Sequence, residues 1–250
     1  MTRANTIILI PARLASERLP DKPLADIGGI PMIVRVWQQA EAANCGRVVV
    51  ASADQAIADA VVNAGGEAVL TNPALPSGTD RIVAALNQID PGKRVEQVIN
   101  LQGDLPFFPP ELLSRVLEPF RDPDIDMSTL ACASSDVDER ENRAIVKVVA
   151  TGLHQGASMG EALYFSRCPV PHGHETFFHH IGIYGFRRTT LEKFAALPPS
   201  PLERAEKLEQ LRALEAGMRI GVVRVESVPA GVDTPAELEL ARQMARDTTA

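Results

Sequence analysis

The sequence is poor in features that mark several classes of protein. It has three cysteines, Cys45, Cys132 and Cys168, which are far apart and lack C-x-x-C spacing, so neither a disulfide framework nor a zinc–thiolate site is indicated. No apolar run reaches the ~18 residues that a membrane span needs. The apolar run near the N-terminus is too short for a signal peptide. We therefore expect a cytoplasmic protein with no membrane partner.

An excess of positive charge is also missing. The 250 residues include 25 Lys and Arg against 32 Asp and Glu, which gives a net charge of −7. Proteins that bind nucleic acid through its phosphates normally have a basic excess, so we expect no nucleic-acid partner. A small anionic substrate remains compatible with this charge, because it needs only a local basic cleft.

Two familiar phosphate-binding and cofactor-binding motifs are absent as well. The sequence lacks the phosphate-binding motif G-x-x-x-x-G-K-[ST], which excludes a Walker-type NTPase. No G-x-G-x-x-G follows the first predicted strand, which argues against a nicotinamide-dependent dehydrogenase.

The first half of the chain alternates short β-branched runs with helical patterns. Strands are predicted at 6–10, 47–51, 67–70 and 97–101, and helices from Pro31, over 54–64, 79–89 and 110–120. Strand and helix in series predict right-handed crossovers. The expected fold class is therefore α/β, with a mostly parallel sheet and helices on both faces.

The pattern changes after Met127. Strand-like runs at 127–133, 144–150, 162–167 and 180–186 have little helix between them, which indicates an antiparallel or mixed patch. Ser200–Gly217 then has the pattern of one strong helix, with an apolar stripe made by Leu202, Ala205, Leu208 and Leu211. A strand at 220–225 and a helix at 235–246 complete the chain.

The segment that follows the first strand, residues 11–24, carries Arg13, Arg18 and Lys22 within ten residues. Ligands of open parallel sheets bind at the carboxyl ends of the strands, where this loop lies. Arginine forks and a lysine point charge suit a polyphosphate. The alternative is a solvated surface loop, but its position and charge density favour phosphate binding.

Two carboxylates also follow predicted strands. Asp104 lies in NLQGDLP and Asp233 in PAGVDTP. Together they could hold one Mg²⁺, whose shell substrate phosphates would complete. Simpler explanations are a Gly-Asp turn at Asp104 and a helix N-cap at Asp233. The pairing also requires the two strands to be near neighbours.

Two further clusters contain groups that could bind a ligand. Ser77 and Gly78 begin a predicted helix and could offer hydroxyl and N–H groups to an anion or a base, although a plain cap is the simpler interpretation. Four histidines, His172, His174, His179 and His180, crowd into nine residues. Because the thiols are distant and no H-E-x-x-H is present, zinc is less favoured than a sugar-acid site beside Tyr184.

Taken together, these segments resemble one known family. The order of these segments is typical of 3-deoxy-manno-octulosonate (Kdo) cytidylyltransferases. They are residues 7–40, GGEAVLTNPALPSGTDRI, NLQGDLPFFPP, HHIGIYGFRR, SPLERAEKLEQLRALEAG and GVDTPAELE. The resemblance covers about residues 5–245. Many members carry Glu where this chain has Leu105, and the segment at 168–178 is short for the family.

The resemblance implies a Rossmann-like nucleotidyltransferase fold, one domain over 1–250 with an inserted strand-rich region at about 136–187 that makes a homodimer. It also implies CTP and Kdo as substrates, Mg²⁺ as cofactor and CMP-Kdo for lipopolysaccharide synthesis as product. The implied catalytic residues are Arg13, Lys22, Asp104 and Asp233, of which the two aspartates would hold the metal. Nucleotide binding is implied for Arg13, Ser16, Arg18, Lys22, Ser77, Gly78 and Gln102, and sugar binding for Arg167, His180, Tyr184, Glu209 and Gln210.

On this interpretation the anomeric hydroxyl of the sugar attacks the CTP α-phosphate in line and pyrophosphate leaves. Mg²⁺ on Asp104 and Asp233 would lower the pKa of the hydroxyl, and a second Mg²⁺ backed by Lys22 would stabilise the leaving group. The alternatives are an enzyme for another sugar acid, such as an 8-amino analogue of Kdo or sialic acid, and a non-catalytic CTP-binding relative.

Overall fold

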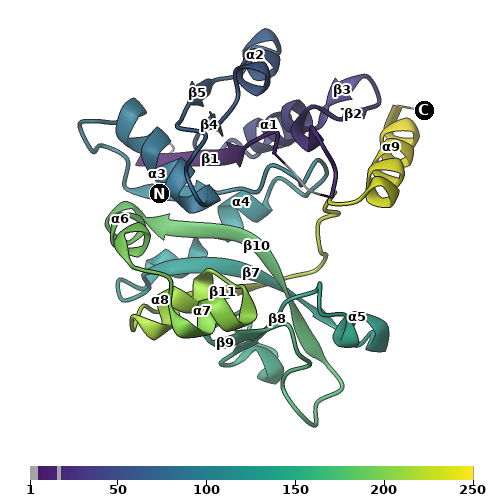
Figure 1. The fold of residues 1–250 in the computed structure, drawn as a ribbon. Coiled ribbons are helices and arrows are strands. Elements are labelled where there is room, and N and C mark those ends of the chain that lie inside the picture. Colours follow the sequence, from purple (N-terminus) through teal and green to yellow (C-terminus); the bar gives the residue numbers. More distant parts are fainter. Residues whose placement is uncertain (1–4, 16–17, 250) are drawn as a thin grey trace. The chain divides into compact units, whose positions relative to one another are not determined.

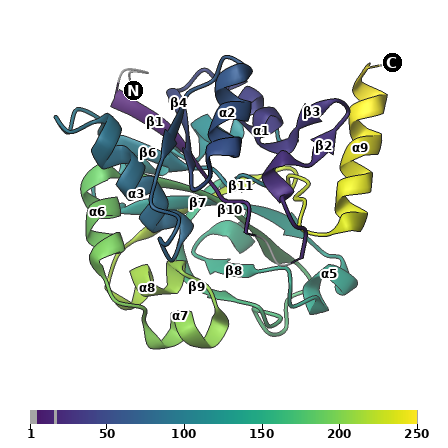
Figure 2. The same cartoon turned by 45° about the horizontal axis from the view of Figure 1, so that its top comes forward.

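The structure is a computed structural model that describes residues 5–15 and 18–249. The chain forms two compact units, one of residues 1–113 and 229–250 and the other of residues 114–228. Figures 1 and 2 show the elements of both units. The expected strand-rich insertion, residues 136–187, falls within the second unit.

The first unit contains a parallel sheet with strand order β5-β4-β1-β6. The strands are β1 (Thr6–Ala12), β4 (Arg47–Ser52), β5 (Ala68–Leu70) and β6 (Gln97–Asn100). The helices between them are α1 (Met32–Ala42), α2 (Gln55–Asn63) and α3 (Gly78–Ile89). All of these elements were predicted, with small shifts at their ends.

The strand order creates a switch point between β1 and β6. The chain moves outward from β1 to β4 and β5, then crosses back to place β6 on the other side of β1. Because such crossovers are right-handed, this reversal puts α3 on the face opposite α1 and α2. The carboxyl ends of β1 and β6 therefore flank the crevice in which α/β sheets bind ligands.

Smaller elements complete the first unit. A 3₁₀ turn (Lys22–Leu24) leads into a hairpin of β2 (Asp26–Ile27) and β3 (Ile30–Pro31), which had not been predicted. The last helix, α9 (Pro235–Thr249), lies beside this hairpin in Figures 1 and 2, and Arg242 donates to the carbonyl oxygen of Asp26 at 3.0 Å. The C-terminal helix thereby closes onto the N-terminal part of the chain.

The second unit contains a mixed sheet with strand order β10-β7-β11-β9-β8. Its strands are β7 (Met127–Ser134), β8 (Lys147–Ala150), β9 (Met159–Ser166), β10 (Phe177–Arg187) and β11 (Ile220–Val225). Only the β7–β11 pair is parallel. The first and last strands of this order, β10 and β8, also pair at His179 and Lys147, so this part of the sheet curves back on itself. This confirms the mixed, strand-rich patch expected from the sequence.

The helices of the second unit are short. They are α5 (Val137–Glu141), α6 (Arg188–Ala196), α7 (Pro201–Glu206) and α8 (Gln210–Glu215), with 3₁₀ turns at Glu118–Arg121 and Leu153–Gln155. A further short helix, α4 (Leu112–Arg115), begins in the first unit and ends in the second. Among the described helices, none is long and apolar enough to cross a membrane.

Two predicted helices are wrong in extent. The helix expected over 110–120 is only α4 followed by a 3₁₀ turn, because Pro119 lacks the N–H that a continuous helix needs. The single helix expected over 200–217 is broken at Lys207, which adopts a left-handed conformation with φ 56°. Leu202 and Ala205 consequently lie exposed instead of joining Leu208 in an apolar stripe.

Candidate active site

The loop after β1 is anchored by a carboxylate from the neighbouring strand. The backbone N–H of Leu14 donates to Oδ2 of Asp54 at 2.8 Å, and the N–H of Ala53 donates to the carbonyl oxygen of Ala12 at 2.9 Å. Asp54 stands at the N-cap of α2 as predicted, yet its side chain makes no capping bond. It holds the start of the loop after β1 instead. Ser16, one of the predicted nucleotide ligands, lies outside the described residues.

Three predicted catalytic side chains meet at the end of this loop. Nζ of Lys22 lies 2.9 Å from Oδ2 of Asp104 and 2.8 Å from Oδ1 of Asp233. Arg18 donates to the other oxygen of Asp233 at 2.9 Å. The two carboxylates converge, but the expectation that their strands are neighbours is wrong, because β6 and β11 are not adjacent in the strand order. An isolated β-bridge between Phe107 and Ala230 brings the segment that carries Asp233 beside the segment that carries Asp104. We call Arg18, Lys22, Asp104 and Asp233 the charge cluster.

Glycine and backbone pairing position Asp104 in the charge cluster. After β6 the chain follows β1, since the N–H of Leu101 donates to the carbonyl oxygen of Leu9 at 3.1 Å. A Cβ at Gly103 would lie 3.0 Å from the carbonyl oxygen of Pro11, so only glycine lets the turn pack this closely. The carbonyl of Asp104 accepts the N–H of Val232 at 2.9 Å, which ties the two acidic segments together.

Asp233 is not the N-cap of the following helix. The hydroxyl of Thr234 accepts the N–H of Glu237 at 3.3 Å, and the Glu237 carboxylate accepts the N–H groups of Asp233 and Thr234, each at 2.8 Å. This is a capping box centred on Thr234. The carboxylate of Asp233 is thus left for Lys22 and Arg18, which argues against the simpler helix-cap explanation.

The charges of the cluster stabilise one another. Burial would lower the pKa of Lys22, but Asp104 and Asp233 outweigh it and raise that pKa above its ordinary value. Burial would raise the pKa of Asp233, but Lys22 and Arg18 hold it below its ordinary value. Two cations facing two carboxylates leave the cluster electrically neutral at neutral pH.

Two cavities adjoin the charge cluster. The larger, of about 850 Å³, is lined by Arg13, Arg18, Lys22, Gln102, Asp104 and Asp233 together with neighbouring backbone. A smaller cavity of about 140 Å³ shares Pro11, Ala12, Arg13 and Gln102 with it and adds Leu75, Pro76, Ser77, Gly78 and Arg81. All the predicted nucleotide ligands that the structure describes line one or both cavities. A charged compartment beside a small one with both polar and apolar walls suits a nucleoside triphosphate.

Ser77 is the N-cap of α3. Its hydroxyl accepts the N–H of Asp80 at 3.1 Å and donates to the carboxylate of Asp80 at 2.6 Å. The capping explanation is therefore correct for its side chain. Gly78 packs against Pro11, because a Cβ there would lie 3.3 Å from the proline ring. Both residues shape the small cavity, whatever contacts they make with a ligand.

The predicted sugar ligands all belong to the second unit. His180 and Tyr184 lie on β10 with ring centroids 5.6 Å apart. Nε2 of His180 is 3.0 Å from the hydroxyl of Thr129, which itself donates to backbone carbonyls of β10. When the Thr129 proton is given to one of these carbonyls, Nε2 carries the ring proton and Nδ1 is an acceptor. Burial, with a smaller contribution from His179, lowers the pKa of His180 to about 3, so this ring is neutral and offers no positive charge to a sugar carboxylate.

The remaining predicted sugar ligands differ in how many of their polar groups already have a hydrogen-bond partner in the protein. The guanidinium of Arg167 donates to the carbonyl oxygens of Glu206, Lys207 and Arg143, so it secures the end of α7. Glu209 lies 3.3 Å from the guanidinium of Arg212. Gln210 is buried, and its Nε2 has no hydrogen-bond partner among the described residues. Of these groups, the Gln210 amide is the donor that most needs a ligand.

The structure offers little support for a zinc site. The rings of His154 and His174 approach to 4.5 Å, but within residues 5–15 and 18–249 no three His, Cys, Asp or Glu side chains form a group that could hold a metal. Asp104 and Asp233 are a pair, which suits a metal whose shell is completed by phosphate oxygens and water.

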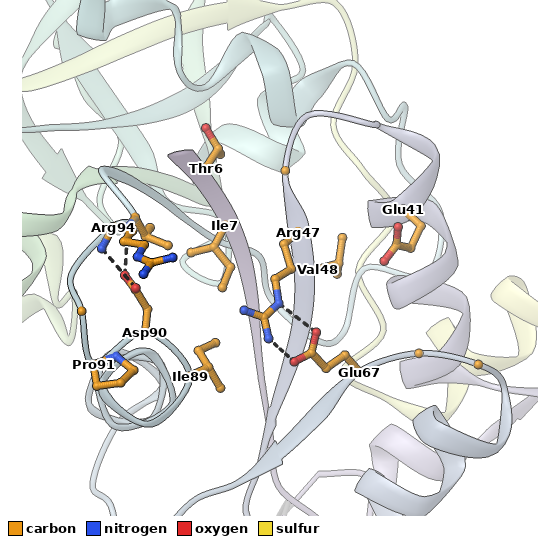
Figure 3. A pocket seen from close by; sticks show the side chains of 15 residues that line it. Thr6, Ile7, Glu41, Arg47, Val48, Glu67, Ile89, Asp90, Pro91 and Arg94 are labelled. Carbon is orange, nitrogen blue, oxygen red and sulfur yellow. Dashed lines mark hydrogen bonds and ion pairs between the residues drawn. The ribbon is translucent and has the colours of Figure 1, made fainter. Parts of the chain in front are cut away.

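A larger cavity, of about 1070 Å³, lies at the amino ends of β1 and β4, at the opposite end of these strands (Figure 3). Three of its charged groups already have partners. Arg47 is paired with Glu67, and Asp90 accepts the backbone N–H groups of Arg94 and Val95. This cavity has no converging side chains comparable to the charge cluster, and we do not assign the chemistry to it.

Comparison with known proteins agrees with this geometry. A sequence model of the cytidylyltransferase family matches residues 7–220. A 3-deoxy-manno-octulosonate cytidylyltransferase of Rhodopseudomonas palustris is 56% identical over 98% of this chain and 99% of its own length. One from Rhodospirillum rubrum is 54% identical over 98% of this chain and 97% of its own.

Solved structures show the same similarity. A CMP:2-keto-3-deoxy-manno-octonic acid synthetase complexed with CTP aligns with a TM-score of 0.88 at 39% identity, covering 97% of this chain and 99% of that one. A 4-diphosphocytidyl-2C-methyl-D-erythritol synthase from Anaerococcus prevotii aligns with a TM-score of 0.64 at 14% identity, covering 96% and 98%, and shows a shared fold only.

Proposed function

This chain belongs to the 3-deoxy-manno-octulosonate cytidylyltransferase family and transfers CMP from CTP to that sugar acid, and we propose that the charge cluster is where the transfer takes place. The observation that supports this most strongly is the convergence of Asp104 and Asp233 on one ammonium group, 2.9 and 2.8 Å away, beside a cavity of about 850 Å³. The product is an activated sugar acid, and pyrophosphate is released.

The two carboxylates fit a magnesium ion. Their oxygens already hold one cation, Lys22, and oxygen ligands of this kind are those that Mg²⁺ prefers. When bound, Mg²⁺ would lower the pKa of the attacking hydroxyl and offset charge on the phosphate. Asp104 and Asp233 would hold it, and Lys22 would then be released toward the triphosphate.

The cations of the loop after β1 can neutralise the negative charge of the leaving group. Arg13 is exposed at the rim of the larger cavity, and Arg18 and Lys22 line it with Arg13. In the transfer, the anomeric hydroxyl loses its proton to water and its oxygen forms a bond to the α-phosphorus, while the bond from that phosphorus to the bridging oxygen of the β-phosphate breaks. Negative charge then accumulates on pyrophosphate, where the three cations can neutralise it. The side chains position and neutralise the reactants and form no covalent bond.

On the sugar side, we assign contacts with the substrate to Arg167, His180, Tyr184, Glu209 and Gln210. His180 would contribute a neutral ring acceptor and Gln210 an unpaired amide donor, which suit sugar hydroxyls. A homodimer formed through residues 136–187, a cytoplasmic location and a place in lipopolysaccharide synthesis belong to the same proposal. They are supported by family membership.

Pyrophosphate release with CTP, Mg²⁺ and Kdo tests the proposal, with UTP and sialic acid as substrate controls. Asp233→Asn should lower kcat about 100-fold, the scale of losing an electrostatic stabiliser. Asp247→Asn, at an exposed position of α9, is the matched control and should leave kcat unchanged. Normal turnover by Asp233→Asn would remove Asp233 from the metal site, and release with another sugar acid alone would reject Kdo as the substrate.

A further inference from the structure

The backbone that carries Asp233 is fixed on both sides of this residue. Before it, Val232 is buried, and its N–H donates to the carbonyl oxygen of Asp104 at 2.9 Å. After it, the chain enters α9, whose first turn contains Glu237. The position of the Asp233 carboxylate therefore depends on what holds the backbone between Val232 and α9.

A single carboxylate oxygen of Glu237 holds the second of these points. Its Oε2 accepts the N–H of Asp233 at 2.8 Å, the N–H of Thr234 at 2.8 Å and the hydroxyl of Thr234 at 3.0 Å. In a capping box, the glutamate reaches back only to the N–H of the capping residue, which here is Thr234. The bond to the N–H of Asp233 is additional, so Glu237 does more than the end of the helix requires.

The helix that carries Glu237 is itself anchored to the first unit. Three of its apolar side chains are buried, namely Leu238, Ala241 and Ala245. Nε of Arg242 donates to the carbonyl oxygen of Asp26, which lies in the hairpin that follows the 3₁₀ turn of Lys22. Glu237 consequently connects Asp233 to a helix that is fixed to the chain just after Lys22.

Without Glu237, the Asp233 carboxylate would have a competing position. The first N–H groups of a helix lack partners within the helix and carry partial positive charge. Aspartate is among the residues that most readily cap them. In this structure Asp233 accepts from Lys22 and Arg18 instead. Glu237 and the Thr234 hydroxyl already satisfy the N–H groups at the start of α9, which removes that competing position.

We propose that Glu237 is a positioning residue, which acts through Asp233 and keeps its carboxylate in the charge cluster for a divalent metal. This inference rests on the proposed function, because it takes Asp233 as a metal ligand. Groups that orient a metal ligand typically contribute about 10- to 100-fold to metal affinity or activity. Loss of Glu237 should therefore weaken metal binding as well as catalysis.

The test measures Mn²⁺ binding by electron paramagnetic resonance without nucleotide, and kcat with CTP, Mg²⁺ and Kdo. Glu237→Ala should weaken Mn²⁺ binding and lower kcat, each about tenfold. Glu237→Gln should stay within about threefold of the wild type in both, because its amide oxygen can accept the same hydrogen bonds. Glu41→Ala, at an exposed position of α1, is the matched control and should leave both values unchanged.

Thr234→Ala separates positioning from simple helix capping. This variant removes the hydroxyl that caps the N–H of Glu237 but keeps the bond between Glu237 and the N–H of Asp233. In urea unfolding, both Thr234→Ala and Glu237→Ala should lose stability, whereas only Glu237→Ala should lose Mn²⁺ affinity. Wild-type Mn²⁺ affinity in Glu237→Ala would overturn the proposal. A loss in Thr234→Ala or in Glu237→Gln as large as that in Glu237→Ala would overturn it too.

The double variant distinguishes this inference from the proposed function. If Glu237 acts through Asp233, adding Glu237→Ala to Asp233→Asn should lower kcat much less than it does in the wild type. A full additional loss of about tenfold would overturn the positioning role. Normal turnover by Asp233→Asn alone would instead reject the proposed metal site.

Discussion

Replacing Lys22 by methionine should make the protein bind a divalent metal more tightly while slowing its reaction. In the structure, the Lys22 ammonium occupies the position between Asp104 and Asp233 that a metal ion would take. A metal that binds in the absence of nucleotide must first displace this ammonium. Methionine keeps the length of the side chain and removes the competing charge.

The magnitude follows from the two ion pairs. Charge-assisted hydrogen bonds are the stronger class, but the side chains of Lys22, Asp104 and Asp233 are 15%, 29% and 41% exposed, so solvent screens them. We assign about 1 kcal/mol to each contact after this discount. Releasing both is worth about 2 kcal/mol, which corresponds to about 30-fold tighter metal binding.

The measurement is Mn²⁺ binding followed by electron paramagnetic resonance, with Mg²⁺ as competitor and no nucleotide present. Lys193→Met, at an exposed position of α6, is the matched control. In the same preparation, Lys22→Met should lower kcat/KM for CTP, because it loses a phosphate ligand. Unchanged or weaker metal binding in Lys22→Met would refute the idea that Lys22 competes with the metal.

Three further predictions concern the surroundings of the site. Asp54→Ala should raise KM for CTP about tenfold in steady-state assays, since the loop after β1 loses its anchor; an unchanged KM would contradict this role. The pKa of His180 is about 3 in the folded state and 6.5 ordinarily, so the unfolded chain binds more protons between these values. Stability should therefore fall as pH drops below 6.5. In urea unfolding at pH 7.5 and pH 5, His180→Gln should lose less stability between the two pH values than the wild type. His172→Gln, whose side chain is exposed, should lose as much as the wild type. Arg212→Met should reduce the free energy of unfolding by about 2 kcal/mol in urea titrations. The reason is that the partly buried ion pair between Arg212 and Glu203, 2.7 Å long, joins α7 to α8. A reduction below about 0.5 kcal/mol would show that the pair contributes no more than an exposed ion pair does.

Sequence alone predicts the parallel half of the fold well, because each buried strand there is a short β-branched run and each helix has a cap or a stop. Gly65, for example, has φ 89° at the end of α2, which a side chain would disfavour. The break at Lys207 carries no such signal. A lysine in a left-handed conformation lets the Glu206 carboxylate reach Ser166 and the N–H of Arg167, and these tertiary contacts override the helical period.

The sequence predicted which residues belong to the candidate site, but it did not predict how they are arranged in space. Position after a strand identified Lys22, Asp104 and Asp233. The pairing of β1 with β6 explains why Lys22 meets Asp104, whereas Asp233 is brought in by the bridge between Phe107 and Ala230. Two residues were missed for the same reason. Asp54 looked like a helix cap and Arg81 like a surface residue, because a sequence pattern describes an element's own turns and not what its side chains reach across the sheet.

Because the charge cluster is neutral, the binding of a metal ion and the binding of CTP depend on each other. Two carboxylates balanced by Lys22 and Arg18 attract neither a metal nor a triphosphate strongly. A divalent cation on the carboxylates would displace Lys22 and leave positive charge facing the larger cavity, which favours the triphosphate. Binding free energies are reciprocal, so CTP must then strengthen metal binding by the same factor. Removing Lys22 should weaken this coupling, since the metal no longer has to release a phosphate ligand in order to bind.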